Sequence, residues 1–283
     1  MKKQLFDRTD TPLRITIIYI ILFIFCVMSI YPILRILTVA LRPGNNLFST
    51  SLRIIPADAT LENFKLAFTK YSLLKWLSNS LIVASISTAF GVLIAIYAGY
   101  AFSRFEFMGK NIGLSMLLVT QMFPATMMLL PLYLMLIKLK LAGTYLGLVT
   151  VYISTAIPFN IWMMKGFYDT IPKSLEESAY VDGATITTSF YKIILPLAKP
   201  AVALVALFSF MGAWSEYIVA RVLLTDASMI TLPVGLVNMQ GQFSTDWGIY
   251  SAAALITAVP VMILFVSLSK YLVGGLTLGS VKG

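Results

Sequence analysis

Long apolar runs separated by charged residues dominate the pattern of the chain. Cutting the sequence at its charged positions leaves six such runs: Ile15–Leu34, Trp76–Ser103, Asn111–Ile137, Leu141–Met164, Pro200–Ser215 and Trp247–Ser269. A helix needs about 20 predominantly apolar residues to cross a hydrocarbon core of ~30 Å. The fifth run is shorter, but only Glu216 interrupts it before Arg221, so we expect its helix to continue to Ala220. The pattern predicts six transmembrane helices, with both termini on one side of the membrane.

One further uncharged stretch, Ala227–Thr245, needs a separate interpretation. It contains Pro233, Gly235 and Gln240, whose polar groups or weak helix propensity would be costly in lipid. We therefore expect this stretch to form an extramembrane or re-entrant segment and not a seventh span.

The composition supports an all-α polytopic membrane protein. Hydrophobic residues make up 59% of the 283 positions and charged residues 12%, about half the share found in soluble domains. A soluble chain of this size could not keep so much apolar surface out of water. The chain has no His, and its single Cys, Cys26, lies in an apolar run. These counts exclude disulfides within the chain and imidazole catalysis, and we expect no cofactor, no metal and no enzyme activity.

The distribution of Lys and Arg predicts the orientation. Cytoplasmic loops of membrane proteins carry an excess of Lys and Arg. Placing the N-terminus inside puts more of these residues in the cytoplasm, helped by four before the first run: Lys2, Lys3, Arg8 and Arg14. The first run is longer than a signal-peptide core and lacks an A-x-A site after it, so we interpret it as an uncleaved anchor. We expect a cytoplasmic N-terminus at 1–14, one membrane domain at 15–283, a cytoplasmic segment at 165–199 and external loops at 42–75 and 221–246.

The cytoplasmic segment 165–199 contains signals for two short helices. Ser174–Glu177 follows Pro172 and has the pattern of a capping box, so a helix should begin there. It should end at Asp182-Gly183, and a second helix, Thr185–Leu195, should run up to Pro196. Two such helices on the inner membrane face would form a platform for docking another protein. A solvated connecting loop is the alternative.

The residues of this segment resemble the "EAA" signature of ABC-importer permeases. Glu177-Ser178-Ala179 is followed after three residues by Gly183 and after nine more by Ile193-Ile194-Leu195-Pro196. Ser178 stands where Ala is usual. The likeness extends to the smaller permease subunits of maltose/maltodextrin importers in four other stretches: Gln121–Pro124, Lys165–Pro172, Tyr180–Ala184 and Gly275–Gly283.

The resemblance implies the type I ABC-importer permease fold in the cytoplasmic membrane of a prokaryote. It also implies four kinds of partner: a second, paralogous permease subunit, two cytoplasmic ATPase subunits, an extracytoplasmic solute-binding protein and an oligosaccharide substrate. Membrane lipid surrounds such a protein, and nucleic acid has no role. The sequence independently lacks a phosphate-binding loop, since its one Gly-Lys pair, Gly109-Lys110, is followed by Asn111. ATP hydrolysis must therefore come from another subunit.

The resemblance favours malto-oligosaccharides as the substrate. Galacto- or arabinogalacto-oligosaccharides remain open, because permeases for other sugars share the cytoplasmic signature. An ion-coupled secondary carrier is an alternative of a different class, but it would need acidic residues within the membrane. Glu216 is the one acid in the expected spans, and on a continuous helix it would lie near the outer interface.

Coupling to the ATPases is expected to depend on the "EAA" segment. Glu176, Glu177 and Asp182 could pair with basic residues in an ATPase cleft, and Gly183 would allow the turn. The alternative is that these carboxylates merely cap a surface helix. The full set of expected coupling residues is Glu176, Glu177, Ser178, Ala179, Asp182, Gly183, Ile193, Leu195 and Pro196. The C-terminal tail around Lys282 could also reach the ATPases, or it could be a plain terminus.

The candidates for the transport pathway come from prolines and from polar or aromatic residues in the spans. Pro124 and Pro131 each remove a backbone hydrogen bond and favour a kink near Gln121. Prolines are also common in transmembrane helices without any role in a gate. Asn160, Trp214 and Tyr217 could offer hydrogen bonds and stacking faces to a sugar, although the two aromatic residues could instead anchor the helix at the interface.

Overall fold

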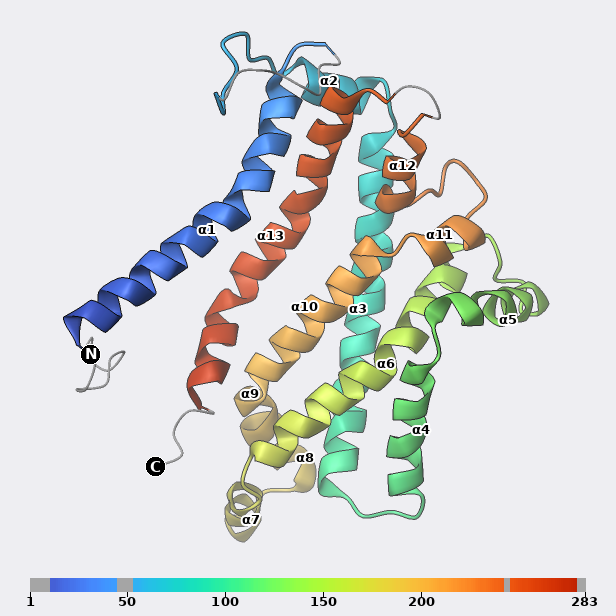
Figure 1. The fold of residues 1–283 in the computed structure, drawn as a ribbon. Coiled ribbons are helices and arrows are strands. Elements are labelled where there is room, and N and C mark those ends of the chain that lie inside the picture. The colour runs from blue at the N-terminus through green and yellow to red at the C-terminus, as the bar shows by residue number, and fades with distance from the viewer. Residues whose placement is uncertain (1–10, 45–52, 242–244, 279–283) are drawn as a thin grey trace. The chain divides into compact units, whose positions relative to one another are not determined.

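The computed structural model describes residues 11–44, 53–241 and 245–278, and the regular structure of this part is helical (Figure 1). The expected roles of Lys2, Lys3, Arg8 and Lys282 fall outside the described residues. The helices are α1 Pro12–Leu41, α2 Glu62–Thr69, α3 Leu73–Arg104, α4 Lys110–Met122, α5 Ala125–Lys138, α6 Tyr145–Thr170, α7 Ser174–Val181, α8 Ile186–Ser189, the π-helical turn η1 Phe190–Ile194, α9 Leu195–Leu197, α10 Lys199–Ser215, α11 Ile218–Leu223, α12 Leu232–Asn238 and α13 Trp247–Leu278.

Four of these helices, α1, α3, α6 and α13, are each long and apolar enough to cross a membrane. Two bent pairs, α4 with α5 and the segment Ile186–Leu197 with α10, pass the same test if each pair is one span. The described residues therefore hold four to six candidate spans, which agrees with the six predicted. By packing, the chain divides into a first unit, 1–71 with 239–256, and a second unit, 72–238 with 257–283.

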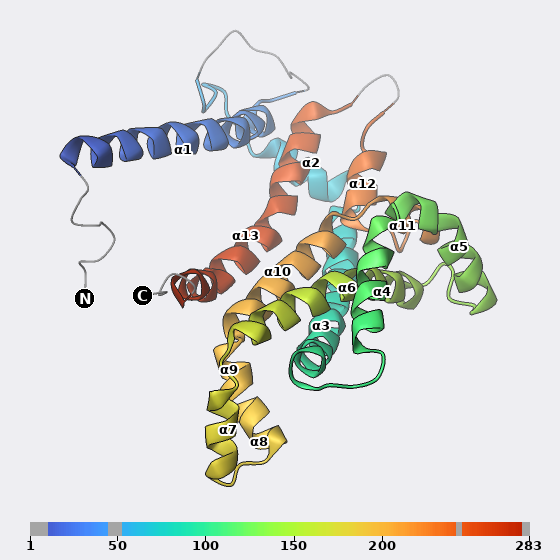
Figure 2. The ribbon, with the colours of Figure 1, turned by 60° about the horizontal axis from the view of Figure 1, so that its bottom comes forward.

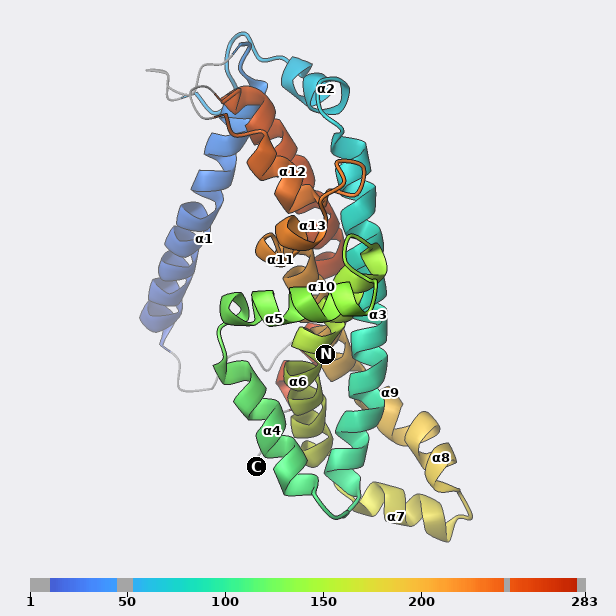
Figure 3. The ribbon, with the colours of Figure 1, turned by 90° about the vertical axis from the view of Figure 1, so that its right-hand side faces the viewer.

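The apolar run Asn111–Ile137 is not one kinked helix, as its prolines suggested, but two helices. α4 ends at Met122, Pro124 occupies the N-cap position of α5, and the two helix axes differ by 108° (Figure 3). The pyrrolidine ring prevents Pro124 from donating a backbone hydrogen bond and disfavours helical geometry at Phe123. Pro131, in contrast, lies inside α5 without ending it.

The prediction that the fifth helix continues to Ala220 is wrong. α10 ends at Ser215, Glu216 has extended backbone geometry, and the short helix α11 begins at Ile218. The Glu216 carboxylate accepts hydrogen bonds from the backbone N–H groups of Val219 and Ala220, at 2.8 and 3.0 Å. It thereby satisfies donors that the first turn of a helix leaves without an intrahelical partner.

In the first unit, α2 packs against the C-terminal end of α1. The Asn63 side-chain amide donates to the carbonyl oxygens of Ala40 and Arg42, at 3.0 and 2.7 Å. Gly248, at the start of α13, lies against Asn63, and a Cβ atom there would come within 2.6 Å of the amide nitrogen. The most apolar 18-residue stretch of α1 has 0% of its residues buried, which suits contact with lipid or with another subunit.

In the second unit, α3 packs against α6 through small residues. Gly91 lies beside Asn160 of α6, and Gly99 lies beside Met164 and the backbone of Lys165. Small residues at four-residue spacing let two helix backbones approach closely, which stabilises helix pairs in lipid. The small residues of α3 therefore hold this subunit together.

Within the stretch expected to lie outside the bilayer, residues 227–238 fold onto α3 as turns followed by the short helix α12. Gly235 of α12 lies against the indole ring of Trp76. The Asn79 amide donates to the carbonyl oxygens of Ser228 and Ile230, and the Ser80 hydroxyl accepts from the N–H of Leu232. These bonds satisfy backbone groups that a non-spanning segment would otherwise leave exposed to lipid.

Replacing Gly99 with Ala is expected to lower the free energy of unfolding by about 1–3 kcal/mol, because the new Cβ would lie 2.7 Å from the Met164 Cβ and 3.1 Å from a backbone nitrogen. Gly166, on the facing helix, has nothing within 4 Å of a built Cβ, so Gly166→Ala should be neutral or stabilising. Thermal unfolding of the two purified variants checks this, and equal midpoints would contradict the packing described.

Candidate functional site

The first candidate site is the "EAA" segment. It belongs to the second unit, where α7 and α8 follow the C-terminal end of α6 (Figure 2). α7 begins at Ser174 as expected, but the capping box is absent, since no side chain caps the helix at Lys173. Its C-terminal end does form as predicted. Gly183 has φ +83°, the N–H of Gly183 donates to Tyr180, and the N–H of Ala184 donates to Ala179 at 2.9 Å. This pair of bonds is a Schellman ending, which fixes the turn into α8.

The second expected helix, Thr185–Leu195, is interrupted. Thr185 caps α8 by accepting from the N–H of Thr188, after which η1 widens the helix by one residue. Pro196 lies inside α9 and not after the end of the helix, which corrects its expected position. A proline ring clashes with the carbonyl four residues earlier in an α-helix, and a π-helical turn directly before it relieves this clash.

The side chain of Glu176 corrects one functional expectation. It does not face outward toward a basic partner, because its side chain is 5% exposed and forms an ion pair with Arg104 of α3. Its Oε1 atom also accepts a hydrogen bond of 2.6 Å from the hydroxyl of Tyr100. Glu177, the next residue, is exposed. The two adjacent carboxylates therefore lie in different environments, one buried and one exposed.

The other coupling candidates divide in the same way between an exposed and a packed set. The exposed residues are Glu177, Ser178, Asp182, Gly183 and Pro196. Ala179 is buried, and Ile193 and Leu195 pack against the core cluster that includes Tyr168, Phe190 and Ile194. One face of α7 therefore belongs to the body of the protein, while the other is open to contact.

The second candidate site is a cavity of about 260 Å³ within the second unit. It lies between α3, α6 and α10, with Ser87, Tyr152, Thr155, Ala156, Phe159, Asn160, Phe208, Ser209, Gly212, Ala213 and Glu216 in its wall. Phe159 and Phe208, both exposed, meet edge to face with ring centroids 5.9 Å apart. The wall thus combines aromatic rings with hydroxyl and amide groups.

The polar groups of this cavity are mostly, but not all, paired. Asn160 is fully buried, and its amide nitrogen and the Ser209 hydroxyl lie 2.8 Å apart. Tyr152 donates to Glu216 at 2.8 Å. The hydroxyl of Ser87 is buried and has no hydrogen-bond partner among the described residues. An unpaired buried hydroxyl in a cavity wall is a group that a bound molecule can satisfy.

Of the predicted pathway residues, Asn160 lines the cavity and the others lie elsewhere. Trp214 is buried, stacks on Phe210 and donates to the carbonyl of Thr257 at 3.2 Å, so its indole presents no free face or donor. Tyr217 is half-buried against a core cluster. The remaining predicted pathway residues are exposed and lie near the α4–α5 break: Gln121, Pro124 and Pro131. The Gln121 amide donates to the backbone carbonyl of Thr155 at 3.3 Å.

Sequence reasoning missed several residues that the structure brings to these sites. Arg104 is not among the predicted site residues, although it is the buried partner of Glu176. Ser87 and Ser209 carried no separate signal within their apolar runs. Helical periodicity could have grouped Tyr152 with Thr155 and Phe159, which lie on one face of α6, but it could not reveal which helix they face.

Comparison with known proteins identifies relatives over nearly the whole length. The family model described as "Binding-protein-dependent transport system inner membrane component" matches residues 91–276. The galactooligosaccharides transport system permease protein GanQ of Bacillus subtilis is 36% identical over 275 residues, covering 96% of each chain. The maltose/maltodextrin transport system permease protein MalG of Vibrio vulnificus is 37% identical over 289 residues, covering 95% of this chain and 96% of the relative. The maltodextrin transport system permease protein MalD of Streptococcus pneumoniae is 37% identical over 269 residues, covering 94% of each chain.

The fold also matches a solved structure. A chain of a bacterial ABC transporter involved in the import of the polysaccharide alginate superposes with a TM-score of 0.77 and 22% sequence identity, covering 95% of this chain and 99% of that one. At this identity the match concerns the fold, and it supports the helical architecture described above.

Gly183 offers a test of the α7–α8 turn. Because nothing lies within 4 Å of a built Cβ, the effect of Gly183→Ala should come from its positive φ alone, at about 1–2 kcal/mol of local stability. Asn tolerates this backbone geometry better, so Gly183→Asn should lose less. Hydrogen exchange of the α7–α8 amides should therefore speed up in the order Gly, Asn, Ala. Equal rates in all three proteins would show that the turn does not depend on Gly183.

Proposed function

The chain belongs to the family of binding-protein-dependent inner membrane components, the permease subunits of ABC importers, and on this premise we propose that it forms half of the membrane pathway of an ATP-driven oligosaccharide importer. It is a multi-pass inner membrane protein, and ATP hydrolysis belongs to a separate subunit. The transported sugar would cross the membrane beside the cavity of α3, α6 and α10.

The observation that carries the sugar assignment is the chemistry of this cavity. Ser87, Asn160 and Ser209 make the wall polar but uncharged, which suits an uncharged, hydroxyl-rich ligand, and the exposed Phe159–Phe208 pair offers apolar rings. The one carboxylate, Glu216, is already bonded to Tyr152 and to the start of α11. Complete small-molecule sites measure ~300–1,000 Å³, so about 260 Å³ suits part of an oligosaccharide. A second permease subunit would supply the rest of the binding surface.

The exposed face of α7 to α9 would dock the ATPases. Two cytoplasmic ATPase subunits would each bind one permease, and Glu177 and Asp182 are the exposed carboxylates here. Orientation with both termini in the cytoplasm puts this segment on the side where ATP is hydrolysed. The external segment 221–246 is then the surface for the binding protein.

For the substrate we favour malto-oligosaccharides, on the basis of MalG and MalD at 37% identity. Galacto-oligosaccharides are the second candidate, because GanQ is 36% identical over a similar length. Ion-coupled carriage is not supported, because the family is that of ABC permeases and Glu216 is bonded within the chain.

The docking role predicts a specific loss. Glu177→Lys reverses an exposed charge, and we expect the ATPase subunits to copurify at least 10-fold less well, since like charges at an interface cost several kcal/mol. Lys173→Glu, an equally exposed reversal just before α7, is the matched control for surface charge. Full copurification of the Glu177→Lys complex would refute docking through this face.

The cavity role predicts a change in transport without a change in docking. Ser209→Ala removes a hydroxyl from the cavity wall and should slow sugar transport by about 2- to 10-fold, the range expected for one hydrogen bond. Ser215→Ala, on the same helix, removes a hydroxyl that is exposed and bonded to Met211, so transport should be unchanged. Uptake of labelled maltotriose and galactotriose into proteoliposomes holding the whole transporter measures both, and it identifies the sugar. Equal rates for the two variants would argue against a sugar path beside Ser209.

A further inference from the structure

The cytoplasmic end of α3 presents three polar side chains to the segment that leads into α7. Tyr100, Ser103 and Arg104 are spaced three and four residues apart and so share one face of the helix. All three contact α6 or α7 in the structure. We call these residues, together with Asp169 and Glu176, the cytoplasmic joint.

Arg104 and Tyr100 hold both sides of the junction between α6 and α7. The Nε atom of Arg104 pairs with Glu176 Oε2, and its Nη2 atom donates to the carbonyl oxygen of Ile171 at 2.9 Å. Tyr100 donates to the other oxygen of Glu176. The Arg104 and Glu176 side chains are 7% and 5% exposed, so the pair is nearly sealed from water.

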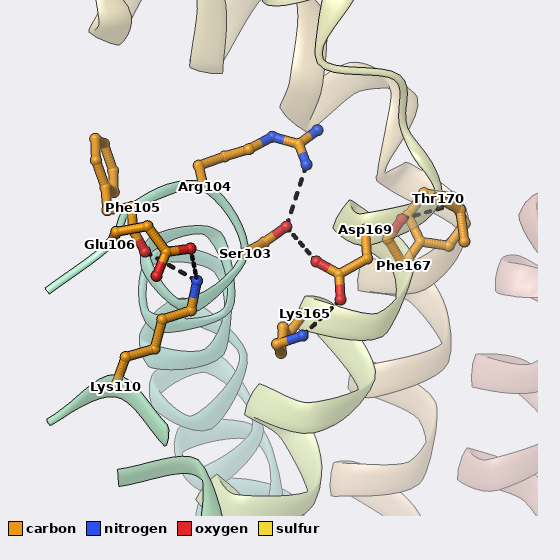
Figure 4. Close-up of polar contacts among 9 residues, drawn as sticks. All are labelled: Ser103, Arg104, Phe105, Glu106, Lys110, Lys165, Phe167, Asp169 and Thr170. Atoms are coloured by element: carbon orange, nitrogen blue, oxygen red, sulfur yellow. Dashed lines mark hydrogen bonds and ion pairs between the residues drawn. The ribbon is translucent and has the colours of Figure 1, made fainter. Parts of the chain in front are cut away.

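A second set of bonds ties the same end of α3 to the last turn of α6 (Figure 4). The Ser103 hydroxyl donates to Asp169 Oδ1 at 2.6 Å, and Arg104 Nη1 donates to the Ser103 hydroxyl at 3.2 Å. Lys165, one turn earlier on α6, pairs with Asp169 Oδ2 at 2.6 Å. The joint thus fixes three helices at one point.

The physical consequence of these bonds is that α7 cannot easily move relative to α3. A buried ion pair contributes little net stability compared with apolar packing, because desolvation offsets the attraction. Removing one member is different, since it leaves a buried charge without its partner. The pair and its hydrogen bonds therefore restrict how α7 can rotate or slide against α3, and α3 carries Ser87 in the cavity wall.

We propose that the Arg104–Glu176 pair, held by Tyr100, makes α3 follow the movement of α7, so that both residues position the transport pathway in response to the ATPases. This inference rests on the proposed docking of the ATPases on α7 to α9. Glu177 contacts the ATPase and Glu176 passes the movement inward. Neither Arg104 nor Glu176 touches the sugar, and Glu176 affects the pathway through α3.

The test uses the assembled transporter with its partner permease, ATPases and binding protein, reconstituted in lipid. Two quantities are measured: ATPase copurification, and the stimulation of ATP hydrolysis by binding protein loaded with maltotriose or, in a parallel arm, galactotriose. The variants are Glu176→Gln, Tyr100→Phe and the charge swap Arg104→Glu with Glu176→Arg. Glu106→Gln is the control, because Glu106 pairs with Lys110 at 2.8 Å but its side chain is 87% exposed (Figure 4).

We expect the Glu176→Gln complex to retain the ATPases. Its stimulation of ATP hydrolysis by the binding protein should fall about 2- to 30-fold, the range seen for residues that couple two sites. Tyr100→Phe removes one donor and keeps the ring, so its complex should assemble fully and lose less. The charge swap should recover part of the stimulation, and the control should match the unmodified transporter.

The outcomes separate this inference from the docking proposal. Normal stimulation in both the Glu176→Gln and Tyr100→Phe complexes would overturn the inference and leave docking intact. A second result would also overturn the inference: fewer complexes assemble, but ATP hydrolysis in those that do assemble is stimulated normally. The pair would then only stabilise the fold. Full ATPase copurification with Glu177→Lys would refute docking itself, whatever Glu176 does.

Discussion

Hydrocarbon offers no hydrogen bonds, so the backbone polar groups that this chain carries into the membrane must find partners inside the protein. The interruptions of its helices illustrate the constraint. Where α10 ends, the Glu216 carboxylate takes up two N–H groups of the next helix. Where the segment after α11 folds back, Asn79 and Ser80 bond its backbone. At these two breaks, polar side chains take up the backbone groups that the helices leave unpaired.

The cavity of α3, α6 and α10 contains both paired and unpaired polar groups. Asn160 and Ser209 pair with each other, whereas the hydroxyl of Ser87 finds no partner among the described residues. In the part of the chain that the structure describes, the cavity wall thus retains one unpaired hydroxyl and two exposed aromatic rings, Phe159 and Phe208.

Neighbouring residues of α7 face in different directions. Successive residues of a helix point about 100° apart. Glu176 and Ala179, three residues apart, face the body of the protein, while Glu177 and Ser178 face outward. One short helix can therefore be anchored firmly on one side and still present charge to a partner on the other. The Schellman turn at Gly183 then sets the direction in which α8 leaves.

The amino-acid sequence alone determined the membrane class, the positions of the apolar spans and the helix ending at Gly183, because hydropathy and backbone preference are local properties. It also determined the family, through the spacing from Glu177 to Pro196. It could not show that Glu176 turns inward, that α10 stops before Glu216, or that Trp214 is buried. Those outcomes depend on groups far away in the chain: the Arg104 side chain lies 72 residues from Glu176, the Tyr152 side chain lies 64 from Glu216, and the Thr257 backbone carbonyl lies 43 from Trp214. Only the tertiary structure decides which of these distant groups meet, since periodicity defines the face of a helix but not the neighbour it packs against.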